Sequence, residues 1–192
     1  MKGPTIPPAA GRVVVRDAQP ADLAAIQAIY AHHVQQGLAS FEEQAPDVDE
    51  MRRRFDDIVA RGLPYLVGCI GEAVAGYGYC APYRARSAYR YVLEDSVYVD
   101  PAVQRRGTGR ALLAALIERC TALGYRQLIA VIGDSAHAPS IGVHADAGFL
   151  RVGTMRSVGF KFGRWVDTVI MQRSLGAGDG SKPGSDPKAA RD

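Results

Sequence analysis

The sequence is poor in the features that define several large classes of protein. Its three cysteines, Cys69, Cys80 and Cys120, lie in apolar surroundings without metal-site spacing, so we expect buried free thiols, as in a reducing cytosol. No apolar run approaches the ~18 residues that cross a bilayer, and the N-terminus lacks the apolar core of a signal peptide. A formal net charge of +3 among 192 residues is too small to indicate nucleic-acid binding. We therefore expect a cytoplasmic protein without a metal ion, a nucleic-acid partner or a membrane partner.

The length and the distribution of glycine and proline predict one domain between two tails. Residues 1–11 are rich in proline and alanine, and residues 176–192 in glycine, serine, proline and lysine, so both are expected to be disordered around a domain of residues 12–175. Apolar periodicity predicts strands near 11–16, 65–70, 73–80, 91–99, 127–132, 149–154 and 167–172, helices near 20–37, 47–61, 111–123 and 140–147, and an irregular turn at 159–165. This order predicts an α/β fold with a single mixed, mostly antiparallel twisted sheet of about seven strands, flanked by helices.

The stretch from Val97 to Arg110 is the most informative part of the chain. An apolar strand is expected to end at Asp100-Pro101, because proline supplies no amide to a strand ladder. A basic turn with Gly107 and Gly109 follows, and then a run of strong helix formers. Such a turn presents free backbone amides at a helix N-terminus, which suits an anion such as a pyrophosphate. The spacing matches neither a Walker loop nor a dinucleotide fingerprint, and a helix start with solvated arginines is the alternative.

Two motifs in this element order point to a known family. Gln104-x-x-Gly107-x-Gly109 stands between a long strand and a long helix, and Ser140–Phe149 forms a later helix that ends in Gly-Phe. Each motif is weak alone, but at this mutual distance the pair resembles the GNAT superfamily of acetyl-CoA-dependent N-acetyltransferases. The resemblance covers residues 12–175 and implies acetyl-CoA as co-substrate.

Four further segments refine the resemblance. They are Pro82–Tyr89, Glu94–Val99, Val131–Gly133 and Gly159–Trp165. All four are similar to the phosphinothricin/methionine sulfoximine N-acetyltransferase branch. This similarity implies an enzyme that acetylates the α-amine of a small amino acid of the phosphinothricin, methionine sulfoximine or methionine sulfone type. It also implies a homodimer.

Two residues are the candidate catalytic groups. An amine is mostly protonated at neutral pH, and only its free base attacks a thioester, so a general base is wanted. Glu94 precedes the anion turn and shares a strand face with Ser96 and Tyr98 by period two, and it matches the catalytic glutamate of the branch. His144 shares a helical face with Ser140, and the branch has histidine at this position, where it can act as acid or base. An exposed strand-end carboxylate and a packing or capping histidine are the respective alternatives.

The resemblance also implies the residues that contact acetyl-CoA. The backbone of residues 97–99 is expected to pair with the pantetheine arm like an added strand, and the amides of the following turn to hold the pyrophosphate. His137 stands where many relatives carry asparagine, so a plain loop histidine is the more natural interpretation there. The complete candidate set is Val97, Tyr98, Val99, Gln104, Arg105, Arg106, Gly107, Thr108, Gly109, Arg110, His137 and Ser140.

An anionic amino-acid acceptor needs cations or amides around it. Arg84 and Arg86 are two apart and would face one way in an extended segment, where an arginine fork suits a carboxylate or a phosphinate. Solvated loop arginines are the alternative. The full candidate set for the acceptor, completed from the resemblance, is Phe41, Arg84, Arg86, Tyr89, Val131 and Gly133.

The remaining aromatic residues and histidines receive structural interpretations. His32 and His33 are expected on the helix surface or lining the cleft. Trp165, with Phe160 and Phe162, is expected in the core or at a dimer contact, which would make the single tryptophan a buried fluorescent reporter.

Three functions remain open from the sequence. The first is acetylation of a small amino acid. The second keeps the fold but changes the acceptor to another small amine or to a protein N-terminus, although two arginines would repel a cationic acceptor. The third is a CoA-binding module without catalysis.

Overall fold

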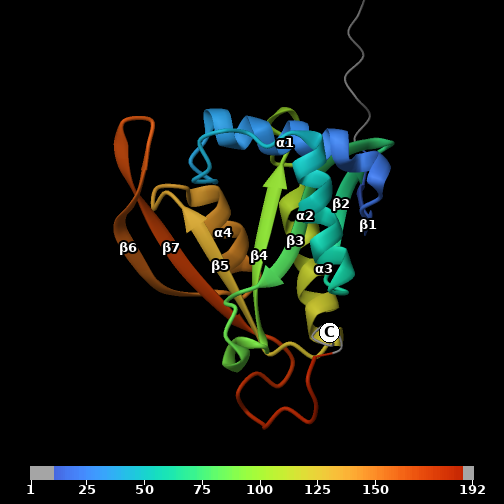
Figure 1. Ribbon diagram of the computed structural model, residues 1–192, viewed down its shortest axis with the longest axis vertical. Helices are drawn as coiled ribbons and strands as arrows, with labels where there is room; N and C mark the ends of the chain where they lie inside the picture. The colour runs from blue at the N-terminus through green and yellow to red at the C-terminus, as the bar shows by residue number, and fades with distance from the viewer. Residues whose placement is uncertain (1–10, 188–192) are drawn as a thin grey trace, which may run out of the picture.

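The computed structural model describes residues 11–187, and its centre is one seven-stranded sheet (Figure 1). The strands lie in the order β1-β2-β3-β4-β5-β7-β6, and neighbours are antiparallel except for the parallel pair β4 and β5. Their bounds are β1 Val13–Asp17, β2 Tyr65–Ile70, β3 Ala73–Pro82, β4 Val92–Val99, β5 Gln127–Gly133, β6 Leu150–Lys161 and β7 Arg164–Ser174. The predicted mixed, mostly antiparallel sheet is confirmed.

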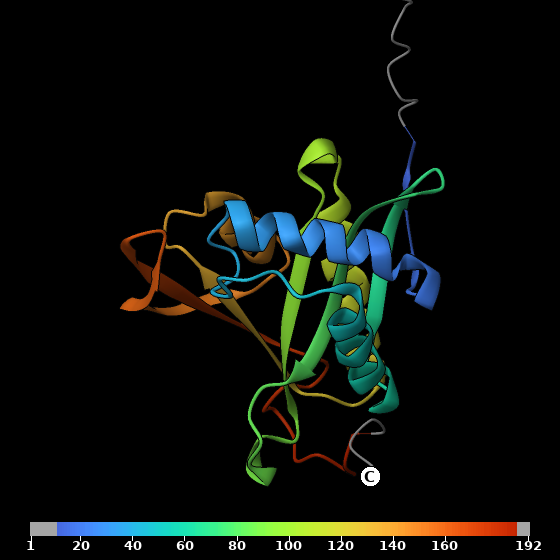
Figure 2. The same cartoon turned by 45° about the horizontal axis from the view of Figure 1, so that its top comes forward.

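Four α-helices cover the two faces of this sheet (Figures 1 and 2). They are α1 Leu23–Gln36, α2 Val48–Ala60, α3 Thr108–Ala122 and α4 Ala138–Asp146, with short 3-10 turns at Pro20–Asp22, Ser87–Tyr89 and Pro101–Val103. Helices α1 and α2 lie on one face, and α3 lies on the other, where α4 packs beside it on β5. Among the described residues, no helix is both long and apolar enough to cross a membrane.

Glycine and tyrosine alternate along β3 and set what each face of the sheet packs against. On the α3 face, a Cβ at Gly76 would lie 2.7 Å from the Tyr98 carbonyl and 3.0 Å from Thr108 Cγ2, so glycine lets the helix approach. On the opposite face, the ring of Tyr77 stacks on Tyr98 at 5.3 Å and on Tyr65 at 5.9 Å. Period two along the strand thus separates a close-packed helix contact from a tyrosine layer below α1 and α2.

The segment at residues 159–165 corrects one expectation. Strand β6 continues to Lys161, and β7 begins at Arg164, so the segment is the tip of a long hairpin that turns at Phe162 and Gly163, with φ of 50° and 73°. Trp165 is 65% exposed, and the rings of Phe160 and Phe162 are exposed as well. The core interpretation of these rings is therefore wrong, whereas the dimer contact, and with it a tryptophan that becomes buried on association, stays a prediction.

The sequence also made predictions for the cysteines and for the two ends of the chain. All three cysteines are free and buried, as predicted. The described part of the C-terminal segment bonds to the domain: Arg126 donates to the Gly178 carbonyl, and Arg90 donates to Asp186 at 2.8 Å. Residues 1–10 and 188–192 lie outside the described residues, so the boundaries of the two tails stay predictions.

Candidate active site

The central feature of the site is the place where β4 and β5 separate. The two strands pair only from Val92 to Asp95 and from Gln127 to Ala130. Beyond these residues, β4 pairs only with β3, and β5 pairs only with β7. The strands diverge toward their carboxyl ends (Figure 1), which leaves two unpaired backbone edges facing each other across a split in the sheet. Unpaired strand edges are ready to bond an extended ligand.

The register shows which backbone groups face this split. The Asp100 amide donates to the Ala75 carbonyl on β3, so by alternation the peptide groups of Val97 and Val99 point to the other side, where β5 has departed. The Val99 carbonyl lies 2.9 Å from His33 Nε2. Because a carbonyl only accepts, this ring nitrogen donates. The predicted pantetheine contacts at Val97 and Val99 therefore lie on the open edge, with His33 holding one of their four polar groups.

The basic turn after β4 contains two residues with positive φ just before α3. Gly107 caps α3 with φ of 83°, and Arg105 adopts φ of 64°, a conformation that non-glycine residues rarely take. The first-turn amides of α3 have no partner within the helix, and successive amides in such a turn form a concave nest for an anion. Residues 104–107 are exposed. Arg110, also exposed, pairs with Asp146 at 2.7 Å, which ties the start of α3 to the end of α4.

Glu94 lies at the base of the split, on the α1 and α2 face. It shares this face with Ser96 and Tyr98, as period two predicts, and the ring of Tyr98 packs edge-on against Tyr30 at 5.0 Å. The carboxylate is half-buried, and burial together with the charge of Asp95 raises the pKa of Glu94, while the charge of Arg84 opposes this rise. A carboxylate with a raised pKa near a cleft is a better proton acceptor than a solvated one.

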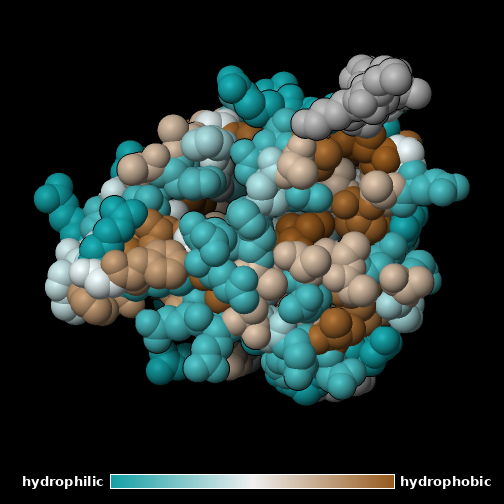
Figure 3. Space-filling model, turned by 90° about the horizontal axis from the view of Figure 1, so that it is seen from above, coloured by the Kyte–Doolittle hydropathy of each residue, from teal (hydrophilic) through white to brown (hydrophobic). Residues whose placement is uncertain are grey.

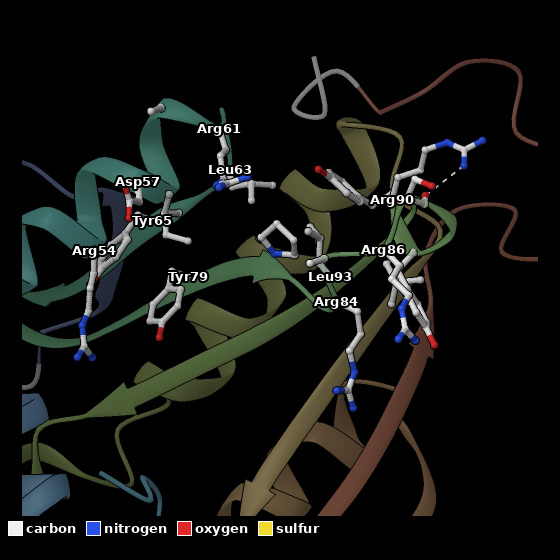
Figure 4. A pocket seen from close by; sticks show the side chains of 18 of the residues that line it. Arg54, Asp57, Arg61, Leu63, Tyr65, Tyr79, Arg84, Arg86, Arg90 and Leu93 are labelled. Atoms are coloured by element: carbon white, nitrogen blue, oxygen red, sulfur yellow. Dashed lines mark hydrogen bonds between the residues drawn. The ribbon is translucent and has the colours of Figure 1, made fainter. Parts of the chain in front are cut away.

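A cavity of about 1050 Å³ lies between α2, β3, the start of β4 and the loop after β3. Its lining includes Arg84, Arg86 and Tyr89 from that loop, and Val92 and Leu93 of β4, the two residues before Glu94. Figure 4 shows the polar ends of Arg54, Tyr79 and Arg84 pointing the same way. The expected extended segment at Arg84 and Arg86 is wrong, because the chain bends there and enters a 3-10 turn at Ser87–Tyr89. The two arginines nevertheless reach one cavity.

Arg54 also lines this cavity, which the sequence did not indicate. Its guanidinium donates to Glu42 at 2.6 Å and to Glu50 at 2.8 Å, and Glu42 also accepts from the Tyr30 hydroxyl at 2.9 Å. These residues come from three separate segments, so no local pattern could have brought them together. The pairing neutralises Arg54, whereas the exposed guanidinium of Arg84 lies 5.0 Å from the centre of the Tyr83 ring, and its charge lowers the pKa of Glu94.

The loop at residues 37–41 covers the far side of the split. A Cβ at Gly133 would overlap the Leu38 carbonyl, and one at Gly159 would lie 2.6 Å from Cδ2 of the Phe41 ring. Lys161 is buried and donates to the Gly37 carbonyl at 3.0 Å and to the Ser40 carbonyl at 2.7 Å. Two glycines and one buried ammonium therefore fix this loop.

The predicted acceptor residues on β5 share the side of the sheet on which Glu94 lies. Glu94 pairs with Ile129, so Ile129, Val131 and Gly133 face the same way as Glu94. Val131 is exposed, and Gly133 lies beneath the loop that carries Phe41. The structure brings the two β5 residues and Phe41 together, whereas Tyr89 belongs to the separate wall of the cavity formed by the loop after β3.

His144 lies on the opposite face of β4 from Glu94. Its Nδ1 is 2.7 Å from the Ser140 carbonyl, and its Nε2 is 3.0 Å from Oδ2 of Asp95. The side chain is only 7% exposed. This placement favours the packing alternative that the sequence left open, and a direct acid or base role for His144 stays a prediction. The buried Asp95 was not identified from the sequence.

The remaining histidines lie around the mouth of the split. His33 is half-buried, and burial lowers its pKa, with smaller contributions from His32 and His137. His137 is exposed and precedes α4, as expected for a loop histidine. Within residues 11–187, no group of three or more His, Cys, Asp or Glu side chains is arranged to hold a metal ion.

Comparison with known proteins identifies this architecture. Residues 15–170 match the family model of the acetyltransferase (GNAT) domain. The chain belongs to the GNAT acetyltransferase family. It is 55% identical to a phosphinothricin N-acetyltransferase of Alcaligenes faecalis, over 88% of this chain and 85% of the relative. It is 37% identical to an L-methionine sulfoximine/L-methionine sulfone acetyltransferase of Salmonella typhimurium, over 85% and 95% of the two chains.

A solved structure supports the same assignment. A GNAT superfamily phosphinothricin acetyltransferase from Sinorhizobium meliloti, in complex with AcCoA, superposes with a TM-score of 0.88 at 47% identity, over 92% of this chain and 96% of that one. The GNAT fold and the resemblance to the phosphinothricin and methionine sulfoximine branch are thereby confirmed.

Proposed function

We propose that the protein transfers the acetyl group of acetyl-CoA to the α-amine of a small anionic amino acid or analogue, of the phosphinothricin, methionine sulfoximine or methionine sulfone type. The observation that carries the proposal is the half-buried Glu94 at the base of a split whose unpaired edges suit an extended acyl-CoA arm. Relatives with these acetyltransferase names support it.

The two substrates occupy different parts of this site. Acetyl-CoA lies along the edge at Val97 and Val99, with its diphosphate on the amides of residues 104–110 and its arm near Ser140. This places the thioester toward the base of the split, near Glu94. The acceptor approaches from the α1 and α2 face, where Arg84 and Arg86 attract its anionic groups and Phe41, Val131 and Gly133 close the opposite side.

Glu94 then serves as the general base. It takes a proton from the ammonium group, directly or through a water, and the free amine attacks the thioester carbon. The C–S bond breaks, and the second proton that the nitrogen loses as the amide forms passes to the departing sulfur, so that CoA leaves as the thiol. The positive charge of the ammonium is removed beside a carboxylate whose raised pKa suits proton transfer.

The experiment is thiol release from acetyl-CoA over a panel of phosphinothricin, methionine sulfoximine, methionine sulfone, an aminoglycoside and a polyamine. We expect turnover of the first three, and a fall of about 10²–10⁴-fold in kcat for Glu94→Gln, with acetyl-CoA affinity by calorimetry unchanged. Glu72→Gln, in the exposed turn between β2 and β3, is the control. Turnover of the cations alone, or unaltered kcat in Glu94→Gln, would contradict the proposal.

We also propose that the protein is a homodimer associated through the β6–β7 hairpin. Strand β6 is an edge of the sheet, and the hairpin projects from the body (Figure 1). Its exposed apolar side chains are Leu150, Val152, Met155, Val158, Phe160, Phe162 and Trp165. Figure 3 shows apolar residues gathered on this projecting arm. Exposed apolar patches of this kind mark interaction surfaces.

Sedimentation velocity tests the dimer. We expect Phe160→Ser to shift the protein toward monomer, whereas Val14→Ser, on the exposed opposite edge strand β1, leaves the sedimentation coefficient unchanged. Emission from Trp165, the single tryptophan, should shift to shorter wavelength as concentration rises. A wild-type monomer at micromolar concentration would refute the proposal.

A cytoplasmic location completes the proposal. The three free, buried cysteines support it, because thiols persist in a reducing compartment.

A further inference from the structure

Asp95 is a buried carboxylate at the base of the split. Its side chain is 1% exposed, and it is the last β4 residue that pairs with β5, through Ala130. One oxygen, Oδ2, contacts His144, and the other, Oδ1, is buried without a hydrogen-bond partner among the described residues. A buried carboxylate is costly unless a cation compensates it, so the state of His144 decides what this residue does.

Both ring nitrogens of His144 face acceptors. The Ser140 carbonyl only accepts, so Nδ1, at 2.7 Å, donates to it. Nε2, at 3.0 Å from Asp95 Oδ2, also donates if the carboxylate is ionised. The geometry suits a doubly protonated ring held between two oxygens, and the ring packs edge-on against Phe149 at 5.0 Å. In that state both nitrogens donate, and neither is free to accept a proton from a substrate.

The contact joins two elements that border the split. His144 belongs to α4, which also carries Ser140 and follows the loop at His137 after β5. Asp95 marks the point from which the strands diverge. A bond between them fixes α4 relative to β4 at the base of the split.

We propose that Asp95 is a positioning residue that, by holding the His144 imidazolium, fixes α4 against β4 and so sets the geometry of the split that receives acetyl-CoA. The inference rests on the proposed function and adds to it a residue that does not touch the reacting atoms. Glu94 and Asp95, although adjacent, then serve different substrates: Glu94 the acceptor amine on one face, and Asp95 the acyl-CoA arm from the other.

The other groups around the pair are two thiols, one cation and an exposed ion pair. Cys80 is opposite Asp95 on β3, and burial raises the pKa of its thiol, so it stays neutral. Cys120 of α3 contacts Cys80, with 3.4 Å between the sulfurs. From β7, Arg173 donates to the Ala147 carbonyl at the end of α4. The exposed pair of Arg110 and Asp146 lies on the solvent side of α3 and α4.

Steady-state kinetics of Asp95→Asn test the proposal. Asparagine keeps the shape and one acceptor oxygen but removes the charge. We expect the KM for acetyl-CoA to rise about tenfold or more, since misplacement by about 1 Å costs up to 10²-fold, while kcat and the acceptor KM change less than about twofold. Asp56→Asn, an exposed position on α2, is the control and keeps wild-type parameters. Wild-type parameters in Asp95→Asn, an equal rise in both KM values, or a fall confined to kcat would overturn the proposal.

Nitrogen-15 spectra of the histidine rings give a readout that requires no catalysis. The chain has only four histidines, so their signals are assignable by substituting His32, His33 and His137 in turn. In the wild type we expect the His144 ring to be doubly protonated at pH 7.5, and in Asp95→Asn to lose that proton at the same pH. A neutral His144 in the wild type would overturn the proposal even if the variant failed to fold. Absence of turnover in the wild type would instead count against the proposed function.

Discussion

Replacement of Gly159 by alanine tests whether the packing of the 37–41 loop controls the acceptor side of the site. The backbone at Gly159 does not have positive φ, so alanine is not excluded by conformation. The obstacle is steric: the new Cβ would overlap Cε2 of Phe41 and lie 2.6 Å from Cδ2 and 2.8 Å from Cζ. Adding a methyl group to a filled position costs about 1–3 kcal/mol. At this chain length, 2 kcal/mol corresponds to a fall in Tm of roughly 4–8 °C.

The matched control is Gly153→Ala in the same strand. A Cβ at Gly153 meets nothing within 4 Å, so we expect a change in stability below about 0.5 kcal/mol. The double variant Gly159→Ala with Phe41→Ala separates a clash from a general strand effect. Once the ring is gone the methyl group is accommodated, so the double variant should be more stable than the sum of the single changes predicts, by about 1–2 kcal/mol.

Two measurements complete the test. Denaturant unfolding supplies the four free energies of the cycle, and steady-state kinetics supply the acceptor KM. Because the displaced ring belongs to the acceptor side, Gly159→Ala should raise the acceptor KM about tenfold and leave the acetyl-CoA KM unchanged. Additive free energies would show that Phe41 does not meet the new methyl group. A rise confined to the acetyl-CoA KM would remove the loop from the acceptor site.

Three further predictions address charges in the site. Arg84→Ala should raise the KM for an anionic acceptor about tenfold without changing that for acetyl-CoA, while Arg52→Ala, exposed on α2, changes neither; equal effects would mean a solvated arginine. Because the base must be ionised and the pKa of Glu94 is raised, kcat/KM should fall on the acid side at a pH above 4.5, and this limb should move to higher pH in Arg84→Ala; an unmoved limb would argue that Arg84 is remote from Glu94. Lys161→Met leaves two loop carbonyls without their buried donor and should cost about 2–3 kcal/mol of unfolding free energy; a change below 0.5 kcal/mol would argue that the ammonium does not fix the loop.

The stability of the protein should also depend on pH through His144. Burial lowers its pKa, but the hydrogen bond and charge of Asp95 outweigh this and raise the pKa above the ordinary value of 6.5. A raised pKa in the folded state stabilises the protein fully below the unfolded value, and the stabilisation is lost as the pH rises through the folded pKa. The destabilisation by Asp95→Asn should therefore be largest near pH 6 and shrink toward alkaline pH in denaturant titrations. A loss independent of pH would contradict the ion pair.

The parts of the fold that the sequence predicted are those with local causes. Proline at 101 and glycine at 107 determine where β4 ends and α3 begins, and period two places Glu94 on the face of Tyr98. These signals act over a few residues, so they are legible without a structure. The long hairpin was missed for the opposite reason. Gly159 and Gly163 suggested an irregular segment, but pairing of β6 with β7 overrides the low strand propensity of glycine.

The contacts that the sequence did not indicate join distant segments. Asp95 and His144 are 49 residues apart, and Lys161 donates to the Gly37 carbonyl 124 residues away. From the sequence alone, Asp95 is interpreted as an ordinary polar residue of a strand. Its burial becomes evident only when α4, which carries His144, is placed over it. Asp95 is buried because β4 is a central strand with helices on both faces. The face of β4 on which Asp95 lies is therefore also closed to water.

Strand β4 explains why these roles fit in so short a segment. Residues 94 and 95 point to opposite faces by pleat, so Glu94 faces the side of α1 and α2 while Asp95 meets α4. The peptide groups at Val97 and Val99 lie in the plane of the sheet and face the gap left by β5. A strand thus presents groups to its two faces and to its in-plane edge. Because β5 leaves β4 after Asp95, this edge is free to bond a ligand. Insertion of one residue between Glu94 and Val97 would reverse the face or edge to which the residues on one side of the insertion point. The spacing of these residues is therefore a geometric requirement of the site.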